Sequence, residues 1–474
     1  MTKYSAISDE EPTPPFTTVG NPSVIGSLDQ DPLLSDQVIE VEEDLNNPLA
    51  TASYFSCAIN LANTILGTGM LAMPAAIASV GIILGSFMIV FSAFASGLGL
   101  YFLSRAASRT EGRQSSFFAV SKLTYPSAAL WFDLAIATKC FGVSISYLII
   151  IGDLMPQVVQ AVGEKLLGGD EYSIFLDRRL WITLSMIVIV PLAFLKRLDS
   201  LRYTSLLGVI AVIYLSFIVV YNYLGPDFEA PPKEKIHLVR FSTKFFTHLP
   251  LFVFAFTCHQ NIFTIYNELF DNSQHRINSV IVGAIGTSSI IYQFIGIMGY
   301  LSFGDDVFPN IITQYKTNMI VTIGRVAIVI HVLFTYPLQA HPCRACLDKI
   351  ISSCSGWRQS SNVNSTENLL NVQRDKVPPT TSHQKYILMT TGILVSSYLI
   401  AMVVSQLDLV LAFVGSTGST TISFILPGIF YYKIHEEHAW TKKKILSVCL
   451  AAYGFAVVTI CLTLNILRAL NLNE

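Results

Sequence analysis

Charged residues are scarce in this chain of 474 residues. Asp, Glu, Lys and Arg make up 13% of it, whereas a soluble globular domain carries about 25%. Hydrophobic residues make up 52%, and the mean hydropathy is +0.53. This balance excludes a water-soluble domain and predicts an all-α polytopic membrane protein. Its lipid contact follows directly, and no nucleic-acid partner is expected.

Catalytic and metal-binding motifs are also missing. The sequence has no nucleophile and base at a known motif spacing, no phosphate-binding loop and no cluster of metal ligands, so an enzyme is not expected. Cys343 and Cys346 form a C-x-x-C pair without a second pair, which favours reduced structural thiols over a metal site. We therefore expect no metal and no organic cofactor.

Long apolar runs account for most of the chain. Runs of about 18 residues or more predict eleven transmembrane helices. They lie near Ser53–Val80, Ile82–Leu103, Ser127–Val162, Trp181–Leu195, Ser205–Leu224, Phe245–Phe270, Asn278–Phe303, Met319–Pro342, Tyr386–Val404, Leu409–Tyr432 and Ile445–Leu467. With the N-terminus in the cytosol, the cytosolic loops carry roughly twice as many Lys and Arg as the opposite side, which favours that orientation.

The first 50 residues have a different composition. They are rich in Pro, Ser, Asp and Glu, which predicts a disordered cytosolic tail without a secretory signal. Within the tail, Asp29, Leu33 and Leu34 fit an acidic dileucine sorting pattern that adaptor proteins would read. A chance match is the alternative.

The first apolar span is polar at its centre. It reads Asn60-Leu-Ala-Asn63-Thr64-Ile-Leu-Gly67-Thr68-Gly69 and continues to Pro74 without a charge. Such a sequence favours an opening of the helix, and open backbone at membrane depth is typical of binding sites in secondary transporters. The N–H groups after the break suit an anionic group such as a carboxylate. Close packing of small residues against a neighbouring helix is the alternative.

The sixth span repeats this pattern. Five residues able to form hydrogen bonds, Thr257 to Asn261, stand between apolar flanks and predict a second broken helix. Two broken helices, each the first of five spans, predict an inverted repeat of five plus five helices with the site between the halves. The predicted parts are a first repeat at 51–226, a luminal loop at 227–244, a second repeat at 245–434 with a flexible cytosolic loop at 346–384, and an additional eleventh helix with the C-terminus at 435–474.

Ionisable residues within the spans are functional candidates, because charge at membrane depth is costly. The third span contains Asp133, Lys139 and Asp153. Asp133 and Lys139 are not at a spacing that places them on the same helix face. Asp153 lies close enough to the end of the span to be interfacial. For coupling to a proton gradient the candidates, in falling order, are His259, His331, Glu268 and Asp153.

Four motifs in order resemble the amino acid/auxin permease family. They are the segment from Asn60 to Gly69; Phe256-Thr-Cys258-His259 followed by Ile265-Tyr266-Asn-Glu268; Thr335-Tyr-Pro337 followed by Pro342-Cys-Arg344; and the segment from Gly415 to Pro427. The resemblance covers about residues 51–467 and is strongest to fungal vacuolar amino-acid transporters. It implies a LeuT-like inverted-repeat fold and amino acids as substrate.

The resemblance also implies a site. The substrate carboxylate would bind at the first break and its ammonium at carbonyls of the second, which gives the substrate-binding candidates Asn63, Thr64, Leu66, Gly67, Thr68, Gly69, Phe256, Thr257, Cys258 and His259. In sodium-coupled relatives an Asn of the first span and a Thr of the eighth help to hold the ion, and these correspond to Asn63 and Thr335.

The expected function is proton-coupled export of amino acids from a vacuolar or lysosome-like lumen by a monomer. Sodium-coupled symport, a plasma-membrane location and an amino-acid sensor with little flux are the alternatives. The sequence leaves the identity of the amino acid open, because side-chain selectivity depends on the shape of the pocket.

Overall fold

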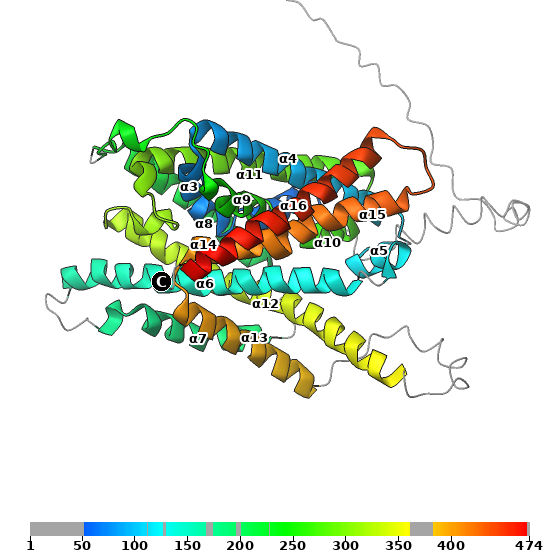
Figure 1. Cartoon of the computed structure of the whole chain (residues 1–474). Helices are drawn as coiled ribbons and strands as arrows, with labels where there is room; N and C mark the ends of the chain where they lie inside the picture. Colours follow the sequence, from blue (N-terminus) through cyan, green and yellow to red (C-terminus); the bar gives the residue numbers. More distant parts are fainter. Residues whose placement is uncertain are drawn as a thin grey trace, which may run out of the picture. The chain divides into compact units, whose positions relative to one another are not determined.

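The computed structural model of the chain describes residues 52–110, 112–126, 129–166, 174–195, 201–226, 228–360 and 383–471. The predicted tail, with its sorting residues Asp29, Leu33 and Leu34, lies outside these residues. The described ranges are built of helices, and one isolated β-bridge pairs Ala52 with Leu269. The helices (Figure 1) are α2 (Tyr54–Ile65), α3 (Gly69–Val80), α4 (Ile82–Ala107), α5 (Phe117–Leu123), α6 (Ala129–Leu166), α7 (Arg178–Ala193), α8 (Leu201–Leu224), α9 (Thr243–Ala255), α10 (Ile262–Glu268), α11 (Gln274–Phe303), α12 (Met319–Ser360), α13 (His383–Val403), α14 (Leu407–Val414), α15 (Leu426–Ile434) and α16 (Lys442–Asn471).

The number of membrane spans differs from the prediction. Among the described residues, nine stretches are long and apolar enough to cross a membrane, and the bent pair α2 and α3 makes a tenth. The predicted fourth span, Trp181–Leu195, corresponds to α7, which has 16 residues. At 1.5 Å per residue this helix is about 24 Å long, shorter than the hydrocarbon core of about 30 Å. Up to ten spans are therefore present in the described part, and the count of eleven stays a prediction.

Part of the segment predicted as a cytosolic loop is helical. The sequence predicted a flexible loop at 346–384, but α12 continues as a helix to Ser360. The composition of the segment hid this, because Ser and Cys residues interrupt its apolar pattern. Lys385 at the start of α13 forms an ion pair with Asp348 and donates a hydrogen bond of 2.7 Å to the Ser352 hydroxyl, so α12 and α13 meet here.

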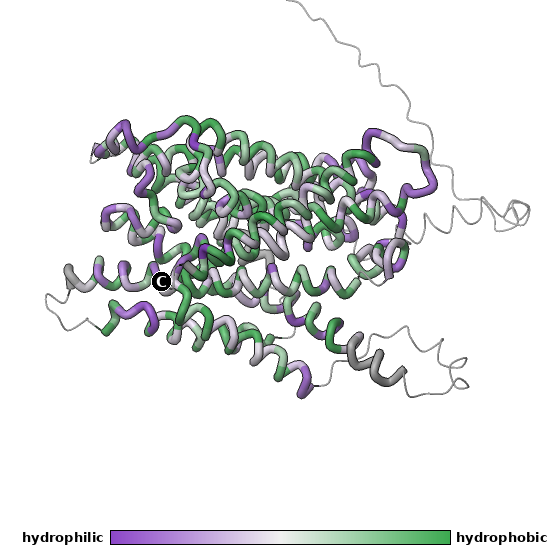
Figure 2. Tube along the Cα trace, in the orientation of Figure 1, coloured by the Kyte–Doolittle hydropathy of each residue, from purple (hydrophilic) through white to green (hydrophobic). Residues whose placement is uncertain are grey.

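Three of the spans lie in the interior of the bundle. In the most apolar windows of Ala129–Gly163 and Thr243–Glu268, 83% of the residues are buried, and in Leu407–Ile434 the share is 78%. The corresponding share is 33% for α13 and α16, which lie at the periphery. Hydrophilic residues gather at the ends of the helices, and the middle of the bundle is mostly hydrophobic (Figure 2). The interior spans α6, α9–α10 and α14–α15 are therefore the parts of the described bundle that are best shielded from lipid.

A short segment of the predicted luminal loop is fastened to the helices below it. This segment, His237–Arg240, is called the luminal strap here. Backbone hydrogen bonds join Ile82 N–H to His237 O (3.0 Å), Ile83 N–H to Leu238 O (2.8 Å) and Arg240 N–H to Val80 O (2.7 Å). Gly81 allows this close approach, because it has φ +87° and a Cβ there would lie 2.8 Å from His237 O. The strap thus lies alongside the connection between α3 and α4 and is held to it by backbone hydrogen bonds.

Candidate functional site

The first predicted break is present. Helix α2 ends at Ile65, α3 begins at Gly69, and the two helices are bent by 55°. Within the described residues, no backbone hydrogen bond is donated by the N–H groups of Thr68 and Gly69. A Cβ on Gly67 would meet nothing within 4 Å, so open space adjoins the break. Two backbone donors at the start of a helix, beside open space, form a site that suits a carboxylate.

The second predicted break is present as well. Helix α9 ends at Ala255, the next three residues are not helical, and the chain resumes with a 3₁₀ turn, His259–Asn261, and then α10. The Phe256 carbonyl, which the sequence left free for a substrate ammonium, accepts a hydrogen bond of 2.7 Å from the Ser96 hydroxyl. Part of the predicted binding capacity of this break is therefore used inside the protein.

Tyr292 joins the two breaks, and sequence reasoning missed it. This residue of α11 is fully buried, and its hydroxyl lies 2.5 Å from Ile65 O and 3.0 Å from Ala255 O. These are the carbonyls of the last residues of α2 and α9. A phenol has one proton, so it donates fully to one of the two at a time. The only signal in the sequence was a tyrosine within an apolar span.

A second link runs through Thr64. The Asn261 side-chain amide donates a hydrogen bond of 2.8 Å to the Thr64 hydroxyl, which donates in turn to Asn60 O at 2.9 Å. The Thr68 hydroxyl is buried and has no hydrogen-bond partner among the described residues. Thr64, near the end of α2, is thus joined to Asn261 in the 3₁₀ turn that follows the second break.

His259 is held on both ring nitrogens. Its Nε2 lies 3.1 Å from Ser96 O, and its Nδ1 lies 3.0 Å from the Ser423 hydroxyl. A neutral ring satisfies both contacts, because Nε2–H donates to the carbonyl and Nδ1 accepts from the hydroxyl. The side chain is fully buried. This arrangement gives the first-ranked coupling candidate a structural task.

His331, Asn63 and Thr335 lie together. A Cβ on Gly208 of α8 would lie 2.5 Å from Asn63 Oδ1 and 2.8 Å from His331 Cε1, so the side chains of Asn63 and His331 approach each other at Gly208. Thr335 donates a hydrogen bond of 2.6 Å to His331 O and lies 3.4 Å from His331 Nδ1. Asn63 of the first span and Thr335 of the eighth, the two residues predicted to hold a sodium ion, therefore each lie close to the His331 side chain.

The two carboxylate candidates lie away from the breaks. Asp153 forms an ion pair of 3.2 Å with Arg178, whose guanidinium also donates to the carbonyls of Ala401 and Val404 at 3.1 Å each. This is a link between α6, α7 and the end of α13. Glu268 is the last residue of α10, and its carbonyl accepts a hydrogen bond of 2.9 Å from Ala52 N–H near the start of α2. Neither residue is brought to the centre.

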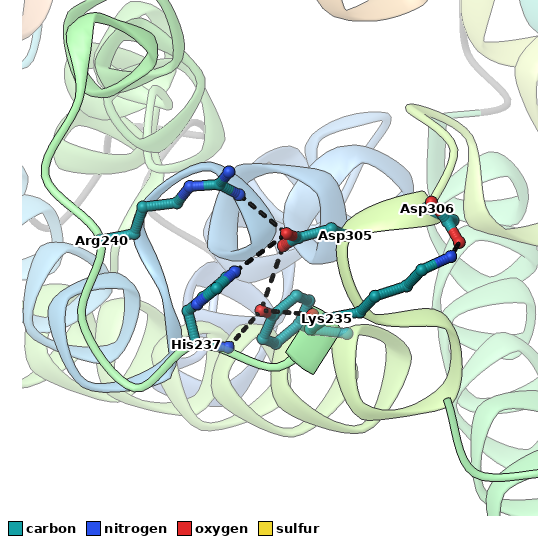
Figure 3. A network of polar contacts seen from close by, with 6 residues as sticks. Lys235, His237, Arg240, Asp305 and Asp306 are labelled. Carbon is teal, nitrogen blue, oxygen red and sulfur yellow. Dashed lines mark hydrogen bonds and ion pairs between the residues drawn. The ribbon is translucent and has the colours of Figure 1, made fainter. Parts of the chain in front are cut away.

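A cavity of about 610 Å³ lies at the predicted luminal end. Residues of α3, the start of α9, the start of α14 and the end of α16 line it. Two ion-pair groups border this cavity. Asp305 accepts from Arg240 at 2.9 Å and contacts His237 at 3.1 Å, next to the pair of Lys235 and Asp306 (Figure 3).

The second ion pair on this cavity joins the additional helix to the bundle. Arg468 of α16 lies 2.7 Å from Asp408 at the start of α14, and His248 of α9 lies 4.0 Å from the same carboxylate. A cavity lined by charged residues therefore adjoins α3 and the start of α9, the two helices that border the breaks.

Comparison with known proteins gives a consistent result. The family model for transmembrane amino acid transporter proteins matches residues 50–467. The chain is 42% identical over 430 residues to vacuolar amino acid transporter 5 of Schizosaccharomyces pombe, covering 89% of this chain and 96% of that protein. It is 36% identical to vacuolar amino acid transporter 5 of Saccharomyces cerevisiae, covering 85% and 96%. Sodium-coupled neutral amino acid transporter 7 of Bos taurus is 26% identical, covering 86% and 85%.

Proposed function

The chain belongs to the transmembrane amino acid transporter family, and from this premise we propose that it exports amino acids from the lumen of the vacuole to the cytosol, driven by the proton gradient. It is a transporter and not an enzyme. The names of the fungal relatives support the vacuolar membrane. The observation that carries the proposal is the meeting of two interrupted helices at Tyr292, in the interior of the bundle.

In this proposal the amino acid binds with its charged ends on bare main chain. Its carboxylate accepts hydrogen bonds from the N–H groups of Thr68 and Gly69, with room at Gly67. Its ammonium donates to the carbonyls of Ile65 and Ala255, where it takes the place of the Tyr292 proton. Broken helices that present such groups are typical of inverted-repeat transporters, which supports the five-plus-five repeat as part of the proposal.

In this proposal the coupled proton binds to His331, a residue of the eighth span. Of the four titratable candidates, His331 is the one whose side chain lies close to Asn63, and Asn63 belongs to the broken first span. Sodium coupling is the second candidate, because Asn63 and Thr335, which carry side-chain oxygen atoms, each lie close to His331 and one relative is named as sodium-coupled. A full sodium shell would need main-chain carbonyls in addition.

The test uses purified protein in liposomes with a pH gradient or a sodium gradient imposed separately. Uptake of labelled amino acids that follows the pH gradient and ignores sodium supports the proposal. Uptake that requires sodium and ignores the pH gradient would instead support sodium-coupled symport. Uptake driven by neither, together with amino-acid-dependent binding of partner proteins, would instead identify a sensor.

A further inference from the structure

An apolar groove of about 630 Å³ opens on the surface at the predicted cytosolic ends of α15 and α16. Its lining residues come from these two helices, from the turn that joins them and from the segment at the start of α6. They are Tyr125, Trp131, Gly428, Ile429, Tyr432, Trp440, Val448 and Ala451, and none of these side chains is charged. The proposed function depends on the interior of the bundle and leaves this groove without a role.

The groove has small residues at its floor and aromatic residues at its rim. Helices α15 and α16 cross closely at Gly428, where an added Cβ would lie 2.9 Å from Ala451 Cβ and 3.0 Å from Ala451 N. At the rim, Trp131 and Trp440 are 66% and 65% exposed, as is typical of tryptophans at the level of the lipid headgroups. From Lys444 to Ala451 helix α16 rises by about 10 Å. The groove therefore extends from headgroup level into the region of the acyl chains.

Two lysine ammonium groups lie at the mouth of the groove. Lys433 Nζ lies 5.3 Å from the centre of the Tyr125 ring. Lys444 Nζ lies 5.3 Å from the centre of the Tyr432 ring and 5.2 Å from that of the Trp440 ring. All three rings line the groove. Positive charge is therefore held next to an apolar channel.

The turn between α15 and α16 is built around Lys444. This side chain is 3% exposed, and its ammonium donates hydrogen bonds of 2.9 Å to Glu436 O and to His438 O. These bonds fix the turn that carries Trp440, so the rim is formed before a ligand binds. The turn is mostly hydrophilic, whereas the two helices that it joins are mostly hydrophobic (Figure 2).

Positive charge exceeds negative charge at this turn. Residues 433–444 contain the lysines Lys433, Lys442, Lys443 and Lys444 and the glutamates Glu436 and Glu437. Glu436 pairs with Lys433. The three consecutive lysines form no ion pair with another described residue, and Lys443 donates a hydrogen bond of 2.8 Å to the Tyr101 hydroxyl. Basic residues at the cytosolic end of a transmembrane helix attract anionic lipids. The charge of the turn therefore complements a phospholipid headgroup with a net negative charge.

A second groove farther along α16 provides a contrast. Its volume is about 270 Å³, and its lining residues are Phe87, Met88, Phe91, Phe245, Phe246, Leu249, Tyr453, Ala456, Val457, Ile460 and Cys461. This lining contains no charged residue. The acyl chain of any lipid would suit the second groove, so a preference for one headgroup is expected only at the first.

We propose that the groove at Tyr432 and Trp440 binds an anionic phospholipid of the cytosolic leaflet. One acyl chain lies between α15 and α16 against Val448 and Ala451, and the headgroup lies at the lysines of the turn. A zwitterionic lipid fits the same groove but gains no net attraction from these lysines. The inference is independent of the ion that drives transport.

The experiment measures quenching of tryptophan fluorescence by brominated lipids. The full-length protein carries Trp181→Phe and Trp357→Phe, so that Trp131 and Trp440 at the rim are the reporters. It is placed in phosphatidylcholine bilayers in which a fraction of the lipid is brominated phosphatidylserine or brominated phosphatidylcholine with the same chains. The association constant should be at least about fivefold higher for phosphatidylserine, which is the contribution of one basic side chain near a membrane surface.

Variants separate the charge from the groove. Replacing the exposed residues Lys442 and Lys443 together by Gln should lower this ratio toward one, whereas replacing both by Arg, which keeps the charge, should retain it. Val448→Phe fills the groove and should also lower the ratio, although every lysine is still present. Two matched controls should behave like the parent protein. Lys316→Gln removes an exposed lysine from the predicted luminal side, and Ala456→Phe fills the second groove.

Three outcomes would overturn the proposal. The first is equal quenching by the two brominated lipids in the parent protein. The second is a preference for phosphatidylserine that Val448→Phe leaves unchanged, because surface charge alone would then account for it. The third is relief of the quenching by glycerophosphoserine, the soluble headgroup without acyl chains, because the turn would then bind a free anion and not a lipid.

Discussion

Replacing Tyr292 by Phe tests the geometry at the two breaks. The hydroxyl is buried at 2.5 Å from Ile65 O and 3.0 Å from Ala255 O, and it donates one proton. Its removal costs one buried hydrogen bond, about 0.5–1.5 kcal/mol of stability in the empty protein. In the wild type, the substrate ammonium must displace this proton from the carbonyls in order to bind. In Tyr292→Phe this hydrogen bond is absent, so its free energy no longer opposes binding. The apparent affinity for the amino acid should then increase roughly two- to tenfold.

Two measurements with opposite signs check this prediction. Thermal denaturation of the purified, substrate-free protein should show a lower melting temperature for Tyr292→Phe, and exchange in liposomes should show a lower KM. Tyr300→Phe is the matched control: Tyr300 is also fully buried, but its hydroxyl accepts from His237 N–H at 2.8 Å in the luminal strap. It should lower stability without changing KM. Weaker binding in Tyr292→Phe would refute the reasoning, because it would mean that the hydroxyl contacts the substrate directly.

Three further predictions concern single positions. Gly69→Val should abolish uptake while the protein still inserts into the membrane, because a Cβ there would lie 3.1 Å from Ala255 Cα; a fluorescent fusion reports insertion. His331→Gln should reduce uptake driven by a pH gradient and spare exchange at equal pH, as separate flux assays would show. Asp408→Asn should lower the free energy of unfolding by about 1.5–3 kcal/mol, measured by denaturation, because Arg468 loses its carboxylate partner at 2.7 Å.

The two breaks could be predicted from the sequence because their causes are local. Glycines and hydroxyl side chains at 64–69 and the polar run at 257–261 conflict with a continuous helix in lipid, whatever surrounds them. The structure interrupts the helices at both places.

The roles of individual side chains could not be predicted, because they depend on partners far away in the chain. His259 stood first among the proton-coupling candidates, but its ring lies between Ser96 and Ser423, each more than 160 residues distant. Tyr292 contacts carbonyls of two other helices that no local pattern indicates. The interfacial position of Asp153 stays a prediction, and no local pattern indicates its partner Arg178, which belongs to the next helix.

The luminal strap has a consequence for how the protein can move. Three backbone hydrogen bonds attach it to the α3–α4 connection, and Tyr300 and Asp305 attach it to the end of α11. If α3 tilts during transport, this end of α11 must therefore move with it, or the hydrogen bonds and the ion pair of the strap must break. The ends of α3 and α11 that contact the strap should therefore move together as one rigid unit. The bending would then occur at Leu66–Thr68, between α2 and α3.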